Sequence, residues 1–247
     1  MPDTRITRQK IKDHMSYSKK VYIIGAIIAA LMSSLLFTVT RYRSPNERAV
    51  YIALVDTYTM ADNLGDVIPS MLAAGQEFDN TLEEVTFTSI AYSGRDDVST
   101  QEDYYGAQIY TVQLYAADND AYVQCLRLTE DMIMQDYCVA LETLPGYDAF
   151  VQRFPNAEFL WREQITPELY KKISNGEEIV ADDYAEPLPT HAYAISVDSL
   201  TGFIERSAYD NREKYVCIVS TSTNIDTTFE VLTEMFARLA PSAEAAQ

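Results

Sequence analysis

The sequence predicts an α/β fold in which an N-terminal transmembrane helix precedes one domain with a mainly parallel sheet and helices on both faces. Three observations lead to this prediction. Residues 21–40 carry no charge. Beyond them, short apolar runs alternate with amphipathic segments, which is the order of strands and helices in parallel sheets. The roughly 200 residues after the apolar stretch have the length of a single domain.

Residues 21–40 have the length and composition of a membrane-spanning helix. At 1.5 Å per residue they extend roughly 30 Å, the thickness of a bilayer's hydrocarbon core. A cleaved secretory signal has a shorter apolar core, about 7–15 residues, followed by a small-x-small cleavage site. Here the run ends Phe37-Thr38-Val39-Thr40-Arg41 without such a site. We therefore expect an uncleaved anchor, and a cleaved signal remains the alternative.

Basic residues predict the orientation of this anchor. Residues 1–20 contain six Lys and Arg residues, whereas the opposite flank contains Arg41, Arg43 and Arg48. Because cytoplasmic flanks are richer in Lys and Arg, the N-terminus is expected in the cytoplasm. The predicted organisation is a basic cytoplasmic segment, a transmembrane helix, a linker, an extracytoplasmic domain and a disordered tail. Their ranges are 1–20, 21–40, 41–48, 49–240 and 241–247.

The outer part of the chain is strongly acidic. Residues 41–247 contain 13 Lys and Arg against 35 Asp and Glu, a formal net charge of −22. A nucleic-acid partner is not expected, because phosphate binding needs a basic surface. The charge suits a tethered domain that stays soluble and apart from anionic lipid, and a cation-collecting surface is the alternative.

Three strands and three helices are expected in the first half of the domain. Apolar or β-branched runs at 49–56, 85–92 and 122–128 predict the strands. Helical spacing predicts a helix at 64–75, capped by Asp62 or Asn63 and kinked at Pro69. A second helix is expected at 101–117 with Tyr105, Ile109 and Val112 on its apolar face. The third begins at Thr129, with acids in its first turn.

The second half is less regular. Thr166-Pro167 and Asn175-Gly176 are typical of the start and end of a helix. Runs at 191–197 and 214–221 predict two further strands, and 226–239 predicts a closing helix with its apolar residues inward.

Ligands of open α/β sheets bind beyond the carboxyl ends of the strands. The polar residues that follow the first three predicted strands are therefore the candidate ligand-binding residues. They are Asp56, Tyr58, Tyr92, Ser93, Thr129 and Glu130. The expected helix start at Thr129 would add backbone N–H donors. Since turn residues after strands are usually polar, an ordinary surface is the alternative.

No catalytic, metal or cofactor motif is found. Gly-x-Ser-x-Gly, the glycine-rich nucleotide loops and the EF-hand pattern are all absent. His191 is the one histidine of the outer part, and a core or edge role is expected for it. Cys125, Cys138 and Cys217 are expected to be buried thiols, with one disulfide as the alternative. The chain is therefore predicted not to be an enzyme and to need no cofactor.

Three segments carry a resemblance to a known group. They are the anchor followed by Tyr51–Val55, the run Tyr122–Leu128 with Thr129-Glu130-Asp131, and Tyr215–Thr221 with Asp226–Leu239. In this pattern the chain resembles bacterial membrane-anchored proteins related to the extracellular solute-binding proteins of ABC transporters. The resemblance implies an architecture like one lobe of a periplasmic-binding-protein fold. The chain has room for one lobe only, lacks a lipid-bearing cysteine, and receives no ligand residue from the resemblance.

The expected function is non-catalytic. The domain would capture a small solute or contact a transporter subunit at the membrane. A structural or assembly partner in a cell-envelope complex is the second hypothesis, and an anchored hydrolase is the third.

Overall fold

The computed structural model describes residues 8–9, 12, 19–40, 42, 44–59, 61–95, 100–164, 171–172, 175, 188–209 and 212–240. The chain forms two compact units, Met1–Arg43 and Ser44–Gln247. The helix predicted from Pro167 to Asn175 and the tail 241–247 lie mostly or wholly outside the described residues.

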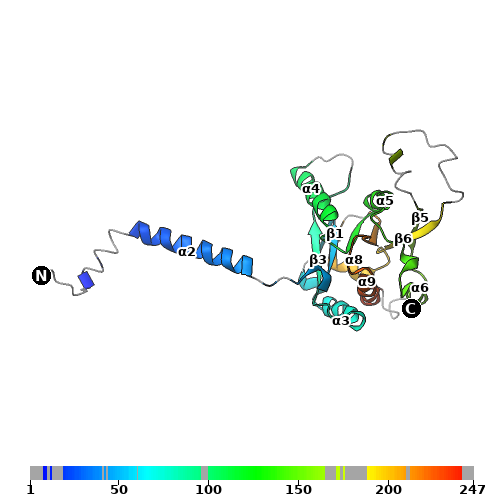
Figure 1. The fold of residues 1–247 in the computed structure, drawn as a ribbon, viewed down its shortest axis with the longest axis horizontal. Helices are drawn as coiled ribbons and strands as arrows, with labels where there is room; N and C mark the ends of the chain where they lie inside the picture. The colour runs from blue at the N-terminus through cyan, green and yellow to red at the C-terminus, as the bar shows by residue number, and fades with distance from the viewer. Residues whose placement is uncertain are drawn as a thin grey trace. The chain divides into compact units, whose positions relative to one another are not determined.

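The first unit contains the long helix α2, Lys19–Thr40 (Figure 1). It has the predicted position, because the run of Ile, Leu and Ala contains no proline and one glycine. Its described side chains are exposed along its length, from Val21 to Phe37. Within the described residues, no helix combines the length and apolar character that crossing a bilayer requires.

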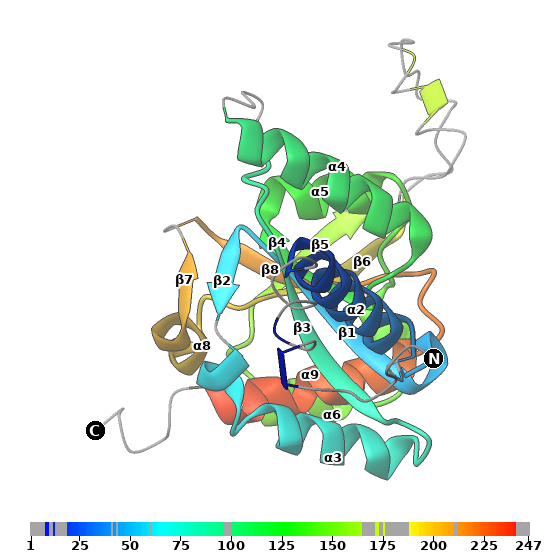
Figure 2. The same ribbon diagram turned by 90° about the vertical axis from the view of Figure 1, so that its left-hand side faces the viewer.

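The second unit is built on one six-stranded sheet with the strand order β3-β1-β4-β8-β6-β5. The bounds are β1 Ala49–Val55, β3 Glu84–Ile90, β4 Ala121–Cys125, β5 Phe159–Glu163, β6 Thr190–Ser196 and β8 Lys214–Ile218. A two-stranded ribbon pairs β2, Thr57–Thr59, with β7, Ser207–Tyr209. Helices cover both faces of the large sheet, as predicted (Figure 2).

The prediction of a mainly parallel sheet was wrong, because the sheet is mixed. β1 is parallel to β3 and to β4, whereas the pairs β4–β8, β8–β6 and β6–β5 are antiparallel. After β4 the chain passes through two helices, α5 (Leu126–Met134) and α6 (Tyr147–Arg153), before it re-enters the sheet. Between these helices Cys138 pairs with Val219, just beyond the carboxyl end of β8, so α5 has carried the chain to the opposite end of the sheet. The segment with α6 brings it back, and β5 therefore starts at the end where β4 stopped and runs antiparallel to β4.

Two helix starts differ from the sequence prediction. Helix α3 is Ile68–Phe78, so Pro69 lies in its first turn, where proline needs no N–H partner, and does not kink it. Asp62 and Asn63 belong to the short 3-10 helix η2, Ala61–Leu64. Helix α5 begins at Leu126 instead of after Thr129, because β4 ends three residues earlier than predicted.

Helix α4, Gln101–Ala116, is close to its predicted range but presents the opposite face to the core. Its buried residues are Gly106, Tyr110 and Leu114. Gly106 is required there, because a Cβ would lie 1.8 Å from the carbonyl oxygen of Ala91. The expected inner residues Tyr105, Ile109 and Val112 are exposed. The helix carries apolar residues on two faces, so periodicity alone did not identify the inner one.

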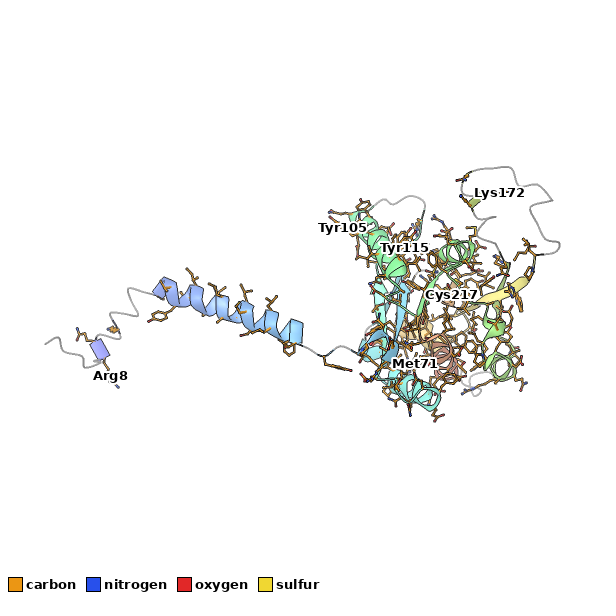
Figure 3. All side chains as sticks on the ribbon, viewed as in Figure 1. Arg8, Met71, Tyr105, Tyr115, Lys172 and Cys217 are labelled. Carbon is orange, nitrogen blue, oxygen red and sulfur yellow. The ribbon has the colours of Figure 1, made fainter. Side chains whose placement is uncertain are left out.

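Alternate side chains of the central strands point to opposite faces of the sheet and belong to two separate hydrophobic cores. On β1, Ile52 and Leu54 join the core formed with α3 and with α9, Ile225–Leu239. Ala53 and Val55 join the core beneath α4 and α5. Figure 3 shows Met71 and Cys217 within the body of this unit. The remaining described elements are η1 (Asn46–Arg48), η3 (Leu141–Thr143) and α8 (Thr201–Arg206).

Phe150 is the centre of the first core. Its ring lies 4.9–6.0 Å from the ring centroids of four other phenylalanines, and 1% of the residue is exposed. They are Phe154, Phe159, Phe229 and Phe236. These rings fasten α6 and β5 to α9.

Replacing this side chain tests the packing. Phe150→Ala is expected to lower the free energy of unfolding by about 3–5 kcal/mol, because it removes a buried ring and leaves a cavity. Phe78→Ala is the matched control, since Phe78 is 50% exposed and should cost well under half as much. Urea denaturation measures both, and equal losses would contradict the assignment of the core.

Candidate functional site

The carboxyl ends of β1, β3 and β4 lie together beside a pocket of about 640 Å³. Its lining comes from the loop after β3, the start of α5 and the segment before β8. The lining residues are Gly94, Arg95, Cys125, Leu126, Arg127, Glu130, Arg212 and Glu213. The lining contains three arginines and two glutamates, a formal charge of +1, in a part of the chain whose net charge is −22. Two acids outside the lining pair with these arginines, Asp56 with Arg212 and Asp131 with Arg127.

A buried lysine joins the two halves of the sheet beside this pocket. Lys214, at the start of β8, is fully buried, and its Nζ donates to the carbonyl oxygens of Val55 at 3.1 Å and Asp56 at 2.9 Å. The Asp56 carboxylate lies 4.0 Å from the same Nζ and also pairs with Arg212. Asp56 has a φ of 50°, a left-handed conformation in which its backbone turns out of β1.

The loop after β3 is fixed by side-chain hydrogen bonds. Asp103, in the first turn of α4, accepts from the backbone N–H of Ser93 at 2.6 Å and from its hydroxyl at 2.8 Å. Gly94 has a φ of 65°, and a Cβ there would lie 2.8 Å from Leu128. Glycine is therefore needed where the loop passes closest to α5.

Backbone carbonyls of this loop hold two of the arginines. Arg212 donates to the carbonyl oxygen of Ser93 at 2.7 Å, and Arg127 donates to that of Gly94 at 2.5 Å. Arg95 is exposed, and within the described residues no hydrogen bond or ion pair of its guanidinium is seen. The guanidiniums thus lie around one hollow, where they can bind an anionic group.

The start of α5 adds to the positive character of the pocket. Leu126 and Arg127 are the first two residues of this helix, and its first turn contains no acidic residue. Backbone N–H groups of a first turn have no partner within the helix and favour a negative charge. Glu130, one turn further on, is held by Arg162 of β5 and accepts from its Nε at 3.1 Å.

The six sequence-predicted residues differ in their relation to the pocket. Glu130 lines the pocket, and Asp56 and Ser93 hold Arg212, which lines it. Tyr92 belongs to the loop after β3, and its ring packs on Tyr110 of α4. Thr129 is buried inside α5, where its hydroxyl donates to the carbonyl of Cys125 at 3.1 Å, so the expected helix start is absent. Tyr58 belongs to β2, and its side chain lies outside the described residues.

Sequence reasoning missed the basic residues of the site. Arg95, Arg127, Arg212 and Lys214 come from three separate segments, and none follows its strand in a recognisable motif. The available signal was their scarcity, since only 13 of residues 41–247 are Lys or Arg. Three of these 13 residues line the pocket.

Behind the pocket lies a layer of tyrosines. The rings of Tyr92 and Tyr110 are 5.5 Å apart, and Tyr110 donates to Gln124 at 3.0 Å. Burial raises the pKa of the Tyr92 phenol and, more strongly, that of Tyr110. Both phenols therefore stay neutral at physiological pH and act as packing and hydrogen-bonding groups.

A larger hollow of about 870 Å³ lies near the start of α9. Its charged lining residues are Glu77, Asp79 and Asp226, all acidic. The side-chain amide of Asn224, another lining residue, already donates hydrogen bonds to the carbonyls of Asn46 and Ala49. The smaller pocket is the better candidate, because it combines cationic groups with an apolar wall.

The other residues considered for chemistry have structural partners. Nδ1 of His191 lies 2.5 Å from Glu142, which also accepts from the backbone of Ala192. The three cysteines are buried thiols without a disulfide. Within the described residues, no three His, Cys, Asp or Glu side chains are grouped to hold a metal ion.

Comparisons with known proteins add little. No family model and no curated protein matches the sequence. Among solved structures, the chain is similar to the reduced form of OxyR with 12% identity, covering 78% of this chain and 97% of that one. The TM-score is 0.29, which supports no argument about fold or function. The mixed α/β architecture is therefore established by the observed strand order and pairing alone.

The buried lysine gives a direct test of how the site is held. Lys214→Met is expected to lower the free energy of unfolding by about 3 kcal/mol, because it leaves the buried carbonyl of Val55, the part-buried carbonyl of Asp56 and the Asp56 carboxylate without this donor. Arg238→Met is the control, since Arg238 is exposed and its guanidinium pairs, among the residues that the structure describes, with Glu234 on the same helix. Urea denaturation of both variants provides the comparison, and equal losses would contradict the role of Lys214.

Proposed function

We propose that the domain is a non-catalytic binding module that captures a small organic anion, carrying a carboxylate or a phosphate, in the arginine pocket. The observation that supports this proposal is the grouping of Arg95, Arg127 and Arg212 around one hollow of about 640 Å³. That volume lies within the range of small-molecule sites, about 300–1,000 Å³.

Each part of the pocket has a task in such binding. Arg127 and Arg212 are pre-positioned by the carbonyls of Gly94 and Ser93, so little side-chain entropy is lost on binding. Arg95 is exposed and can close over the anion. Cys125 and Leu126 offer an apolar wall for the body of the solute.

We propose further that the N-terminal segment, residues 1–40, attaches the domain to the outer face of the cell membrane. The uncharged residues 21–40 and the six basic residues before them support this location. An anchored solute-binding domain would deliver its ligand to a transporter subunit in the same membrane. Both the location and the transporter role are inferred from the sequence alone.

An assembly role without a small ligand is the second candidate. The exposed apolar face of α4 favours it, since Tyr105, Ile109 and Val112 lie uncovered on the surface. The two roles use different surfaces and can be tested separately.

A thermal-shift screen tests the binding role. Residues 44–247 are screened against small carboxylates, phosphorylated compounds, neutral sugars and amino acids. A cognate anion at 100 times its dissociation constant adds about 2.7 kcal/mol, which corresponds to roughly 5–10 °C for a domain of this size. Arg95→Gln is expected to reduce that shift by more than half, because it removes one of the three cations.

Arg238→Gln is the matched control, because it removes an exposed arginine on α9. It should leave the ligand-induced shift unchanged. If no anion in the panel stabilises the wild-type domain, or if Arg95→Gln keeps the full shift, the anion-binding role is wrong. A response to neutral sugars alone would also overturn it.

A further inference from the structure

The exposed face of α4 is an uncharged surface with several large side chains. Five large side chains on it are about half exposed or more. They are Tyr104 (54%), Tyr105 (52%), Ile109 (49%), Val112 (64%) and Tyr115 (68%). Figure 3 labels Tyr105 and Tyr115 on this helix. Residues 104–117 contain no charged residue, whereas the part of the chain beyond residue 40 carries a net charge of −22.

We propose that this face binds the same face of a second copy of the chain, so that two α4 helices pack antiparallel about a two-fold axis. The proposal concerns a surface separate from the arginine pocket and does not depend on what the pocket binds.

The spacing of the exposed residues suits a pair of helices. Tyr105, Ile109, Val112 and Ala116 follow one another at intervals of four, three and four residues, which places them in one stripe along the helix. The buried residues Gly106, Tyr110 and Leu114 occupy the opposite side. The helix thus has one stripe for its own core and another whose large side chains are exposed among the residues that the structure describes.

The stripe is complementary to itself. In an antiparallel pair centred between Ile109 and Val112, Tyr105 meets Ala116 of the partner subunit and Ile109 meets Val112 of the partner subunit. A large side chain therefore lies opposite a smaller one at every step, as interdigitation of close-packed side chains requires. A two-fold axis repeats each contact, so one uncharged stripe supplies both sides of the interface.

The uncharged stripe lowers the cost of bringing two acidic domains together. Two domains that each carry a net charge of −22 repel one another, and salt screens this repulsion beyond about 8–10 Å. A seam formed by residues 104–117, which contain no acid, avoids the close carboxylate contacts that would oppose pairing. A basic protein partner would be drawn to the acidic remainder of the domain instead. Helices that lie on membranes carry Lys and Arg on their polar face, and α4 contains neither.

The area is consistent with a reversible dimer. Three half-exposed tyrosines, each of about 150–250 Å² in full, together with Ile109 and Val112, make a patch on the order of 500 Å² per subunit. This is as large as the largest apolar patch on a typical monomer and near the lower limit of specific interfaces.

Sedimentation velocity on residues 44–247 tests the proposal. This unit contains every strand of both sheets and both cores, so it can be studied without α2. The wild-type domain is expected to show a dimer fraction that rises with concentration up to about 200 µM, as weak interfaces of this size require. Ile109→Glu should weaken dimerisation at least tenfold, because it places two carboxylates in the seam.

Ile204→Glu is the matched control, because Ile204 is an exposed isoleucine on α8 and should leave the dimer unchanged. A wild-type domain that stays monomeric over this range, or an Ile109→Glu variant with unaltered dimerisation, overturns the proposal. Equal weakening by Ile204→Glu does so as well.

Disulfide trapping tests the register. Under mild oxidation, a mixture of Ile109→Cys and Val112→Cys proteins should yield more cross-linked dimer than either variant alone, because these positions face one another. Preferential linking of each variant to itself would contradict the antiparallel pairing.

Discussion

The buried ammonium of Lys214 is the interaction on which the site depends. β1 and β8 are not neighbours in the sheet, since β4 lies between them, yet Lys214 Nζ reaches the carbonyls that end β1. Removing an ammonium from water is costly, and these hydrogen bonds together with the nearby Asp56 carboxylate offset that cost. Because Arg212 precedes Lys214 by two residues and pairs with Asp56, the same contact fixes one wall of the pocket.

Sequence periodicity predicted most elements of the domain but not their directions. The runs at 49–56 and 214–221 became β1 and β8, because buried strands need continuous apolar side chains whatever their orientation. Direction depends on how many times the chain crosses the sheet between strands, and α6 supplied a crossing that the irregular pattern after Pro145 did not reveal. For α4, apolar residues on two faces made the inner face ambiguous until Gly106 was seen against the backbone of Ala91.

The candidate site was predictable in place but not in chemistry. The rule that ligands bind at carboxyl ends of strands located the edge where Asp56, Ser93 and Glu130 gather. It could not supply Arg212, which reaches that edge from the antiparallel half of the sheet. Thr129 was misplaced because β4 ends at Cys125, which turns the threonine into an interior residue of α5. In so acidic a chain, the positions of the few basic residues indicate a binding site better than those of the many acids. Each clustered arginine creates a local positive potential within the negative potential of the whole domain.

The central claim is that the positive pocket at the start of α5 binds an anion. Amide chemical shifts of the ¹⁵N-labelled domain, followed during titration with citrate at constant ionic strength, test it most directly. The account predicts that the largest changes occur at Gly94, Leu126 and Arg127, whose backbone lines the pocket. Changes concentrated instead at residues 222–227, beside the acidic hollow, or no saturable change at all, would contradict it.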